Sequence, residues 1–167
     1  MRSDPGPDAN VGTWLELHAR ERAAHPALIV EATGERIGYG ELEPVELEVD
    51  LATCWRFSGP VKNYHTDRDE ARKLGFPDVV VQGMLSTCLI SQLMANAFGP
   101  GWLAGGRMDV KLVNVLWGGE RVRACGKVRA EEIEGTTTRK LADVWVEKAD
   151  AARTPVTVGA ASALTGS

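Results

Sequence analysis

Polar and apolar residues alternate over several short stretches of this chain. Residues 44–50 read PVELEVD, in which three apolar side chains are separated by glutamates. Similar alternation occurs over residues 107–112 and 121–129, and two further apolar-rich stretches cover 141–148 and 155–164. Alternation is typical of a strand that buries one face and exposes the other. The pattern predicts five strands, one early in the chain and four in its last third.

One stretch in the middle of the chain has helical spacing instead. No charged residue occurs between Val79 and Gly106, and we expect a helix from Gly83 to about Phe98. Apolar residues cover most of the circumference of this helix, which is typical of a helix surrounded by other structure. Polar residues and the break at 99–101 interrupt the stretch too often for a membrane span. We therefore expect a long central helix and no membrane partner.

Shorter elements around this helix are predicted from their end signals. A capping box opens a helix over residues 13–25, and two short extended pieces follow within 27–40. Further short helices are expected over residues 50–57 and over 67–74, the second ending before Gly75. The candidate N-caps of these two helices are Asp50 and either Thr66 or Asp67.

Together these elements predict a single α+β domain. A central buried helix followed by four strands, with the earlier strand completing the sheet, implies a curved antiparallel sheet wrapped around a long central helix. This is the hot-dog architecture, which we assign to residues 13–167. Residues 1–12 contain two prolines and two glycines and are expected to form a disordered arm. Pairing two such sheets would cover an open edge, so we also expect a homodimer.

Charge and cysteine content restrict the partners. The 167 residues carry a formal net charge of −4, which argues against nucleic acid because phosphate binding needs a basic surface. Cys54, Cys88 and Cys125 are widely spaced and match neither a disulfide framework nor a zinc motif. We therefore expect reduced thiols in a cytoplasmic protein, with no metal and no cofactor.

A loop and the start of the long helix carry the candidate chemistry. FSG at 57–59 is followed by NYHTD at 63–67, by VVVQGMLS at 79–86 and by KLVNVLWGGERVRACGKV at 111–128. In this order and spacing, these segments resemble the MaoC-like dehydratases and R-specific enoyl-CoA hydratases, which share the hot-dog fold. The resemblance extends from about Val45 to the C-terminus.

The chain departs from that family at one position of the loop. The family's loop reads roughly Ser-Gly-Asp-x-Asn-Pro-aliphatic-His, with the catalytic aspartate five residues before the histidine. Ser58, Gly59 and His65 match this pattern. Pro60 occupies the position of the aspartate and has no group that can titrate. Lys62 and Asn63 are further departures, because they stand where the family has Asn and Pro.

The resemblance implies an enzyme that adds or removes water at the β-position of an acyl thioester. The acyl group would be carried by CoA or by the phosphopantetheine of a carrier protein. His65 would act as general acid and base, and the N–H of Gly83 at the helix start would bind the enolate oxygen. Glycine at that place would let the thioester approach closely. The altered loop suits a tailoring enzyme of secondary metabolism.

Three interpretations of His65 remain open. In the first, it is a structural loop residue that caps the next helix or binds a backbone carbonyl. In the second, Asp67 or Asp69 replaces the missing carboxylate, although Asp67 is also well placed as a helix cap. In the third, His65 works without a carboxylate, with Tyr64 or Asn63 as hydrogen-bond donors.

Two residues of the long-helix region are further candidates for substrate binding. Gln82, immediately before Gly83, either orients the substrate or is a solvated loop side chain. Ser91, eight residues after Gly83, either lines the acyl pocket or bonds to its own helix backbone. Basic side chains on two predicted strands form either a solvated face or a landing surface for the phosphates of the carrier. They are Arg107, Lys111, Arg121, Arg123 and Lys127.

Two rival functions fit the same fold. A hot-dog thioesterase would need a carboxylate on the long helix, but no Asp or Glu occurs between Val79 and Gly106. The other rival is a non-catalytic acyl-binding or structural subunit that has lost its aspartate. Pro60 favours this second alternative, whereas His65 and Gly83 argue against it.

Overall fold

The computed structural model describes residues 26–30, 35–38 and 40–165. The predicted arm over 1–12 and the predicted helix over 13–25 therefore lie outside the described residues. Strands β1 (Pro26–Val30) and β2 (Glu35–Gly38) pair with each other in antiparallel orientation and form a small separate sheet. This confirms the two extended pieces expected in this part of the sequence.

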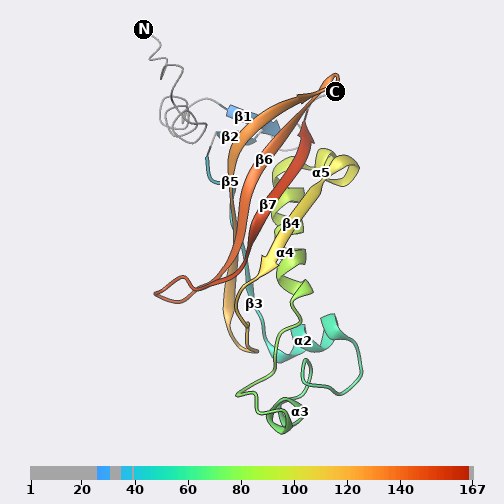
Figure 1. Cartoon of the computed structure of the whole chain (residues 1–167), viewed down its shortest axis with the longest axis vertical. Helices are drawn as coiled ribbons and strands as arrows, with labels where there is room; N and C mark the ends of the chain where they lie inside the picture. The colour runs from blue at the N-terminus through green and yellow to red at the C-terminus, as the bar shows by residue number, and fades with distance from the viewer. Residues whose placement is uncertain (1–25, 31–34, 39, 166–167) are drawn as a thin grey trace.

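The main sheet contains the five strands that alternation predicts, in the order β3-β5-β6-β7-β4. All of its neighbouring strands are antiparallel, and β3 and β4 form its edges (Figure 1). The strands are β3 (Val45–Glu48), β4 (Arg107–Leu112), β5 (Arg121–Glu134), β6 (Thr137–Lys148) and β7 (Pro155–Thr165). The strand expected over 141–148 begins earlier, at Thr137, because the ladder between β5 and β6 continues to the pair Glu134 and Thr137.

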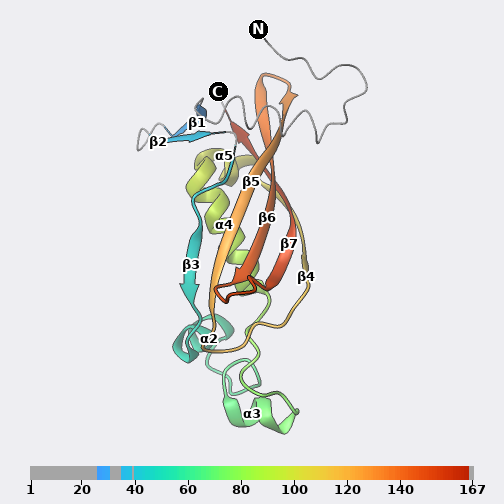
Figure 2. The same cartoon turned by 90° about the vertical axis from the view of Figure 1, so that its left-hand side faces the viewer.

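Helix α4 (Met84–Phe98) lies along the sheet, which curves around it (Figure 2). Ile90, Leu93 and Met94 are fully buried, and they belong to a core shared with apolar side chains of the strands. Gly126 of β5 permits this close packing, since a Cβ there would lie 3.1 Å from Leu93 Cδ2. The predicted hot-dog architecture is therefore confirmed. Among the described residues, none of the helices combines the length and hydropathy needed to cross a membrane.

Helices α2 (Leu51–Ser58) and α3 (Arg68–Lys73) lie beyond one end of the sheet (Figure 1). Asp50 caps α2 by accepting from Thr53 N at 2.7 Å. Of the two candidate caps of α3, Asp67 is the actual one, and it accepts from two backbone N–H groups of the first turn. The cap at Asp67 fixes the end of the loop that contains His65, where the loop enters α3.

The break predicted at residues 99–101 is present, because α4 ends at Phe98, but a further helix that was not predicted follows it. Helix α5 (Pro100–Gly105) begins directly after Gly99, whose φ of 49° ends α4. Pro100 occupies the first turn of α5, where the missing N–H of proline would have no helical partner in any case. The Gly-Pro pair thus turns the chain between two helices.

Gly159 provides a test of the contact between β7 and the edge strand β4. A Cβ at Gly159 would lie 2.1 Å from Asp109 O and 2.7 Å from Val110 Cα, so it would collide with backbone. We expect Gly159→Ala to lower the free energy of unfolding by about 1–3 kcal/mol, measured by urea denaturation. Gly40→Ala is the matched control, because no described atom lies within 4 Å of its Cβ position. Equal losses in both variants would contradict this packing.

Candidate active site

A cavity of about 360 Å³ opens where the loop before α3 meets the start of α4 and the segment after β4. Its walls are mainly apolar and come from Val80, Val81, Leu112, Val113, Val115, Leu116 and Val156. Its polar lining comes from Tyr64, His65, Gln82, Gly83, Ser86 and Asn114. The structure therefore brings together His65, Gly83, Tyr64 and Gln82, four of the predicted site residues.

The imidazole of His65 is held in one orientation by the segment that precedes α4. Its Nδ1 lies 2.7 Å from Val80 O. A carbonyl oxygen only accepts, so Nδ1 carries the proton and donates it. In the neutral ring, Nε2 then bears the lone pair that a general base needs. The ring binds a backbone carbonyl, as the first interpretation of His65 requires, and it also lines the cavity.

Polar contacts within the loop position the backbone of His65. The His65 N–H donates to Asn63 Oδ1 at 2.7 Å, which forms a tight side-chain turn. Thr66 is buried, and its hydroxyl donates to Val61 O at 2.9 Å while accepting from Asn63 N at 3.0 Å. Short polar side chains thus fold the loop on itself and direct the next residue, His65, toward the cavity.

Aromatic rings support the histidine from one side. The Tyr64 ring centroid lies 3.9 Å from that of His65, with the planes tilted by 40°. Phe76 packs on Tyr64 at 6.0 Å, and Trp117 packs on Phe76 at 6.2 Å. These contacts connect the loop to residues on both sides of α4 in the sequence, and they limit movement of the imidazole.

Gly83 is the N-cap residue of α4, and its N–H lies at the positive end of the helix dipole. The helix carries no side-chain cap at this end. A Cβ at Gly83 would lie 2.3 Å from Leu112 Cδ1. The Leu112 side chain at the end of β4 therefore approaches Gly83 closely, in addition to the approach of a thioester that the sequence suggested.

Gln82 lines the cavity and is bound from the opposite side by the end of α2. The Ser58 hydroxyl donates to Gln82 Oε1 at 3.0 Å, and both side chains are partly buried. Gln82 is therefore not the freely solvated loop side chain of the alternative interpretation. Ser58, a residue of the motif that resembles the MaoC-like loop, thus has a definite contact with the segment before α4.

Two further predicted residues lie outside the lining of the cavity. Asn63 uses both ends of its amide within the loop, since Oδ1 accepts from His65 N and Nδ2 donates to Val61 O at 3.2 Å. The Ser91 hydroxyl accepts from Trp102 Nε1 at 3.1 Å and so joins α4 to α5. Both residues have structural contacts that account for their polar groups without a substrate.

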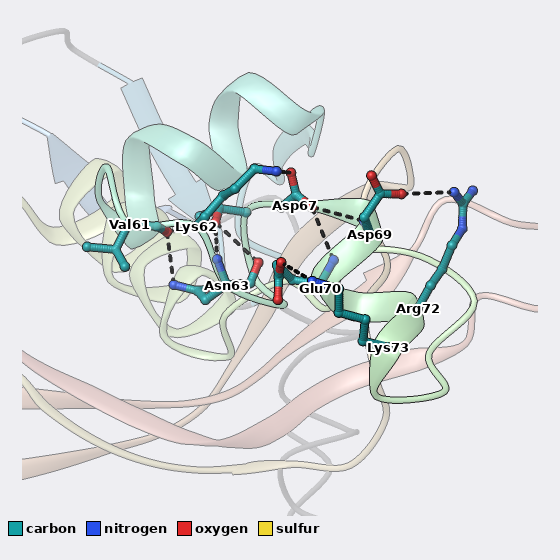
Figure 3. Close-up of polar contacts among 9 residues, drawn as sticks. Val61, Lys62, Asn63, Asp67, Asp69, Glu70, Arg72 and Lys73 are labelled. Atoms are coloured by element: carbon teal, nitrogen blue, oxygen red, sulfur yellow. Dashed lines mark hydrogen bonds and ion pairs between the residues drawn. The ribbon is translucent and has the colours of Figure 1, made fainter.

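The carboxylates considered as replacements for the missing aspartate bind other partners (Figure 3). Asp67 caps α3 and forms an ion pair with Lys62 at 2.9 Å. The hydrogen bond from Lys62, followed by the bond from the Glu70 N–H, lowers the pKa of Asp67. Asp69 forms an exposed ion pair with Arg72 at 3.6 Å. Neither residue lines the cavity, nor does Pro60, and no described lining residue is a carboxylate.

The predicted basic strand faces are partly neutralised by glutamates. Ion pairs join Arg107 to Glu134, Arg121 to Glu48 and Arg123 to Glu147, at 3.1, 3.2 and 3.0 Å. This agrees with the solvated-face interpretation more closely than with a dedicated phosphate surface. Within the described part of the chain, no cluster of His, Cys, Asp and Glu side chains could hold a metal ion.

A pair of buried hydroxyl groups at the cavity was not predicted. Ser86 Oγ donates to Gly83 O at 2.7 Å and lies 2.7 Å from Thr157 Oγ1 on β7. Ser86 follows Gly83 by three residues, and this helical spacing was the available signal for a second cavity residue. Thr157 and Asn114 had no comparable sequence signal, because only the folded sheet brings them to this place.

The sheet around α4, with a cavity at the N-terminus of that helix, defines a hot-dog protein. No family model matches this chain, and no curated protein matches its sequence. Solved structures do match its fold. An R-hydratase from Pseudomonas aeruginosa is 20% identical, with 77% of this chain and 81% of that chain covered at a TM-score of 0.61.

Two further structures give the same result. An (R)-hydratase from A. caviae involved in PHA biosynthesis is 19% identical, covers 76% of this chain and 96% of its own, and has a TM-score of 0.61. A MaoC-like dehydratase from Rhodospirillum rubrum is 16% identical, with 83% and 97% covered at a TM-score of 0.59. At these identities the likeness establishes the hot-dog fold.

Thr66 provides a test of how the loop positions His65. Thr66→Val keeps the shape of the side chain but leaves Val61 O and Asn63 N without their hydroxyl partner. We expect the free energy of unfolding to fall by about 1–3 kcal/mol in urea denaturation. Thr53→Val is the control, because the Thr53 hydroxyl accepts a long, exposed contact from Arg56 at 3.4 Å. A loss no larger than that of the control would show that the loop does not depend on Thr66.

Proposed function

We propose that this protein is a hydratase or dehydratase that acts at the β-position of an acyl thioester. The observation that carries the proposal is the joint position of the His65 imidazole and the Gly83 helix start in one largely apolar cavity. The orientation of the imidazole supports it, since the bond to Val80 O leaves Nε2 as the basic nitrogen. The shared fold with R-hydratases and a MaoC-like dehydratase agrees with this chemistry.

In this proposal, the N–H of Gly83 binds the carbonyl oxygen of the thioester. Removing a proton from the α-carbon places negative charge on the carbonyl oxygen, and that charge needs a hydrogen-bond donor. The N–H of Gly83 is such a donor, and the dipole of α4 adds to its effect. The hydroxyl chain from Thr157 through Ser86 to Gly83 O fixes the first turn of the helix around this donor.

His65 performs both proton transfers, since no described lining residue is a carboxylate. In dehydration, Nε2 takes the α-proton as the Cα–H bond breaks and the enolate forms. The enolate then expels the β-hydroxyl, and the protonated Nε2 returns its proton to that oxygen as the Cβ–O bond breaks. Water and the α,β-unsaturated thioester are released with the imidazole neutral again. One base serves both steps only if both groups leave from the same face, so the elimination is syn.

The proposed substrate is an acyl group on CoA or on the phosphopantetheine of a carrier protein. Apolar side chains such as Leu116 and Val156 suit the hydrocarbon part of such a chain. Pro60 at the position of the family's aspartate distinguishes this loop from that of an ordinary hydratase. A tailoring enzyme with a modified substrate is the setting that we favour.

Replacing the histidine tests the proposal directly. We expect His65→Ala to reduce the rate of dehydration of (R)-3-hydroxybutyryl-CoA by about 10²–10⁴-fold, because general acid–base catalysis contributes a rate factor of this size. Absorbance of the conjugated product measures the rate. Asp69→Asn is the control, since Asp69 is exposed on α3 and should leave turnover unchanged. Equal turnover in wild type and His65→Ala would overturn the role of His65.

A non-catalytic acyl-binding subunit is the second candidate function. The observation in its favour is that the described lining of the cavity contains no carboxylate. This candidate predicts that acyl thioesters bind without any turnover, in wild type and in His65→Ala alike. A thioesterase is less well supported, because α4 also contains no Asp or Glu.

We further propose that two copies of the chain pair through β4. The other edge strand, β3, is short and exposes Glu46 and Glu48, which discourages pairing with another strand. Strand β4 is longer and leads into the exposed apolar residues Leu112, Val113 and Val115, which are 59%, 45% and 45% accessible. An apolar edge of this kind is typical of a surface that another chain covers.

Sedimentation equilibrium tests the pairing. We expect a species of twice the chain mass of 18.0 kDa at micromolar concentration. Introducing charge with the double variant Val113→Asp and Val115→Asp should give a monomer. Ile133→Asp is the control, because Ile133 is 88% accessible at the far hairpin and should not affect assembly. A wild-type monomer, or a dimer in every variant, would contradict pairing through this edge.

A further inference from the structure

We propose that the amide of Gln82, held by the hydroxyl of Ser58, binds the β-oxygen of the substrate. This inference rests on the proposed function and names a group that contacts the oxygen added or removed there. Gln82 would touch the substrate directly, whereas Ser58 would be a positioning residue that acts through Gln82.

The contact between the two side chains determines which end of the amide faces the cavity. Ser58 Oγ donates to Gln82 Oε1 at 3.0 Å, from a position at the C-terminal end of α2. The carbonyl end of the amide is therefore turned toward α2. Gln82 also lines the cavity, so the Nε2 group, with two N–H donors, is the end available to a ligand there.

Three other polar side chains of the lining donate to backbone carbonyls. His65 Nδ1 donates to Val80 O, Ser86 Oγ to Gly83 O, and Asn114 Nδ2 to Pro155 O at 2.7 Å. These bonds hold the walls of the cavity. The Gln82 amide differs from them, because its bond to Ser58 uses the acceptor and leaves the donors for a ligand.

The chemistry of the site gives the amide a specific role. As the Cβ–O bond breaks, negative charge develops on the β-oxygen while His65 delivers its proton. An N–H donor on that oxygen stabilises the charge without taking part in proton transfer. An amide does not titrate, so it can hold the oxygen but cannot act as a base. This division leaves both proton transfers to His65 Nε2, as the syn elimination requires.

Equilibrium binding tests the inference separately from turnover. In the His65→Ala background, in which turnover is expected to be slow, titration calorimetry would compare (R)-3-hydroxybutyryl-CoA with butyryl-CoA. We expect the hydroxylated thioester to bind about 3–10-fold more tightly, as one hydrogen bond allows. The added change Gln82→Met, which keeps the length of the side chain and removes the donors, should abolish this preference. Gln92→Met is the matched control on the exposed face of α4 and should retain it.

Variants at Ser58 test the positioning role. Ser58→Ala should reduce the preference, Ser58→Thr should restore it, and Ser58→Ala should add nothing once Gln82 is methionine. In the enzyme with His65 present, Gln82→Met should lower kcat by about 10–100-fold, and it should raise KM by no more than about the 3–10-fold expected for binding.

Each outcome has a defined meaning. Binding of both thioesters with no preference, or a preference that survives Gln82→Met, overturns the inference and leaves the proposed function standing. A preference lost in Gln82→Met but kept in Ser58→Ala overturns the role of Ser58. Failure of both thioesters to bind overturns the proposed function and the inference together.

Discussion

The candidate site depends on a short extended segment, Val79 to Val81, that is bonded on both sides. On one side, Val80 N donates to Tyr64 O at 3.1 Å and Val80 O accepts from His65 Nδ1. On the other side, Val81 N donates to Leu116 O and Gly118 N donates to Val79 O, both at 2.9 Å. The same segment then continues into α4. This one segment therefore fixes the positions of His65, the apolar lining of the cavity and the start of α4 relative to one another.

Much of this fold could be predicted because its elements have clear periodic patterns. The charge-free stretch predicted α4, and the alternating and apolar-rich stretches predicted the five strands of the main sheet. Asp50 was correctly predicted as the N-cap of α2. The start of α5 was missed, since a Gly-Pro-Gly sequence signals a break locally and only its packing against β7 shows a helix. The extent of β6 was also missed, because polar threonines and basic residues can pair in a ladder without an apolar pattern.

The two candidate site residues that a motif marked lie close together in the fold. His65 and Gly83 were found through their resemblance to a family loop and helix start, and the fold brings both to one cavity. Asn63 was proposed for substrate on its position alone, but an amide in a tight loop also satisfies nearby backbone groups. The Ser86–Thr157 contact joins residues 71 positions apart, so no local pattern could reveal it.

Leu112 connects two features that have been described separately. Its Cδ1 occupies the space that a side chain at Gly83 would need, and it is also the last residue of the edge strand β4. The Leu112 side chain therefore belongs both to the surroundings of the proposed oxyanion donor and to the proposed assembly surface. Covering that edge would restrict the rotamers of Leu112 and so stiffen the first turn of α4. Catalysis would then depend on assembly. Dilution that separates the chains would reduce stabilisation of the transition state while each chain is still folded.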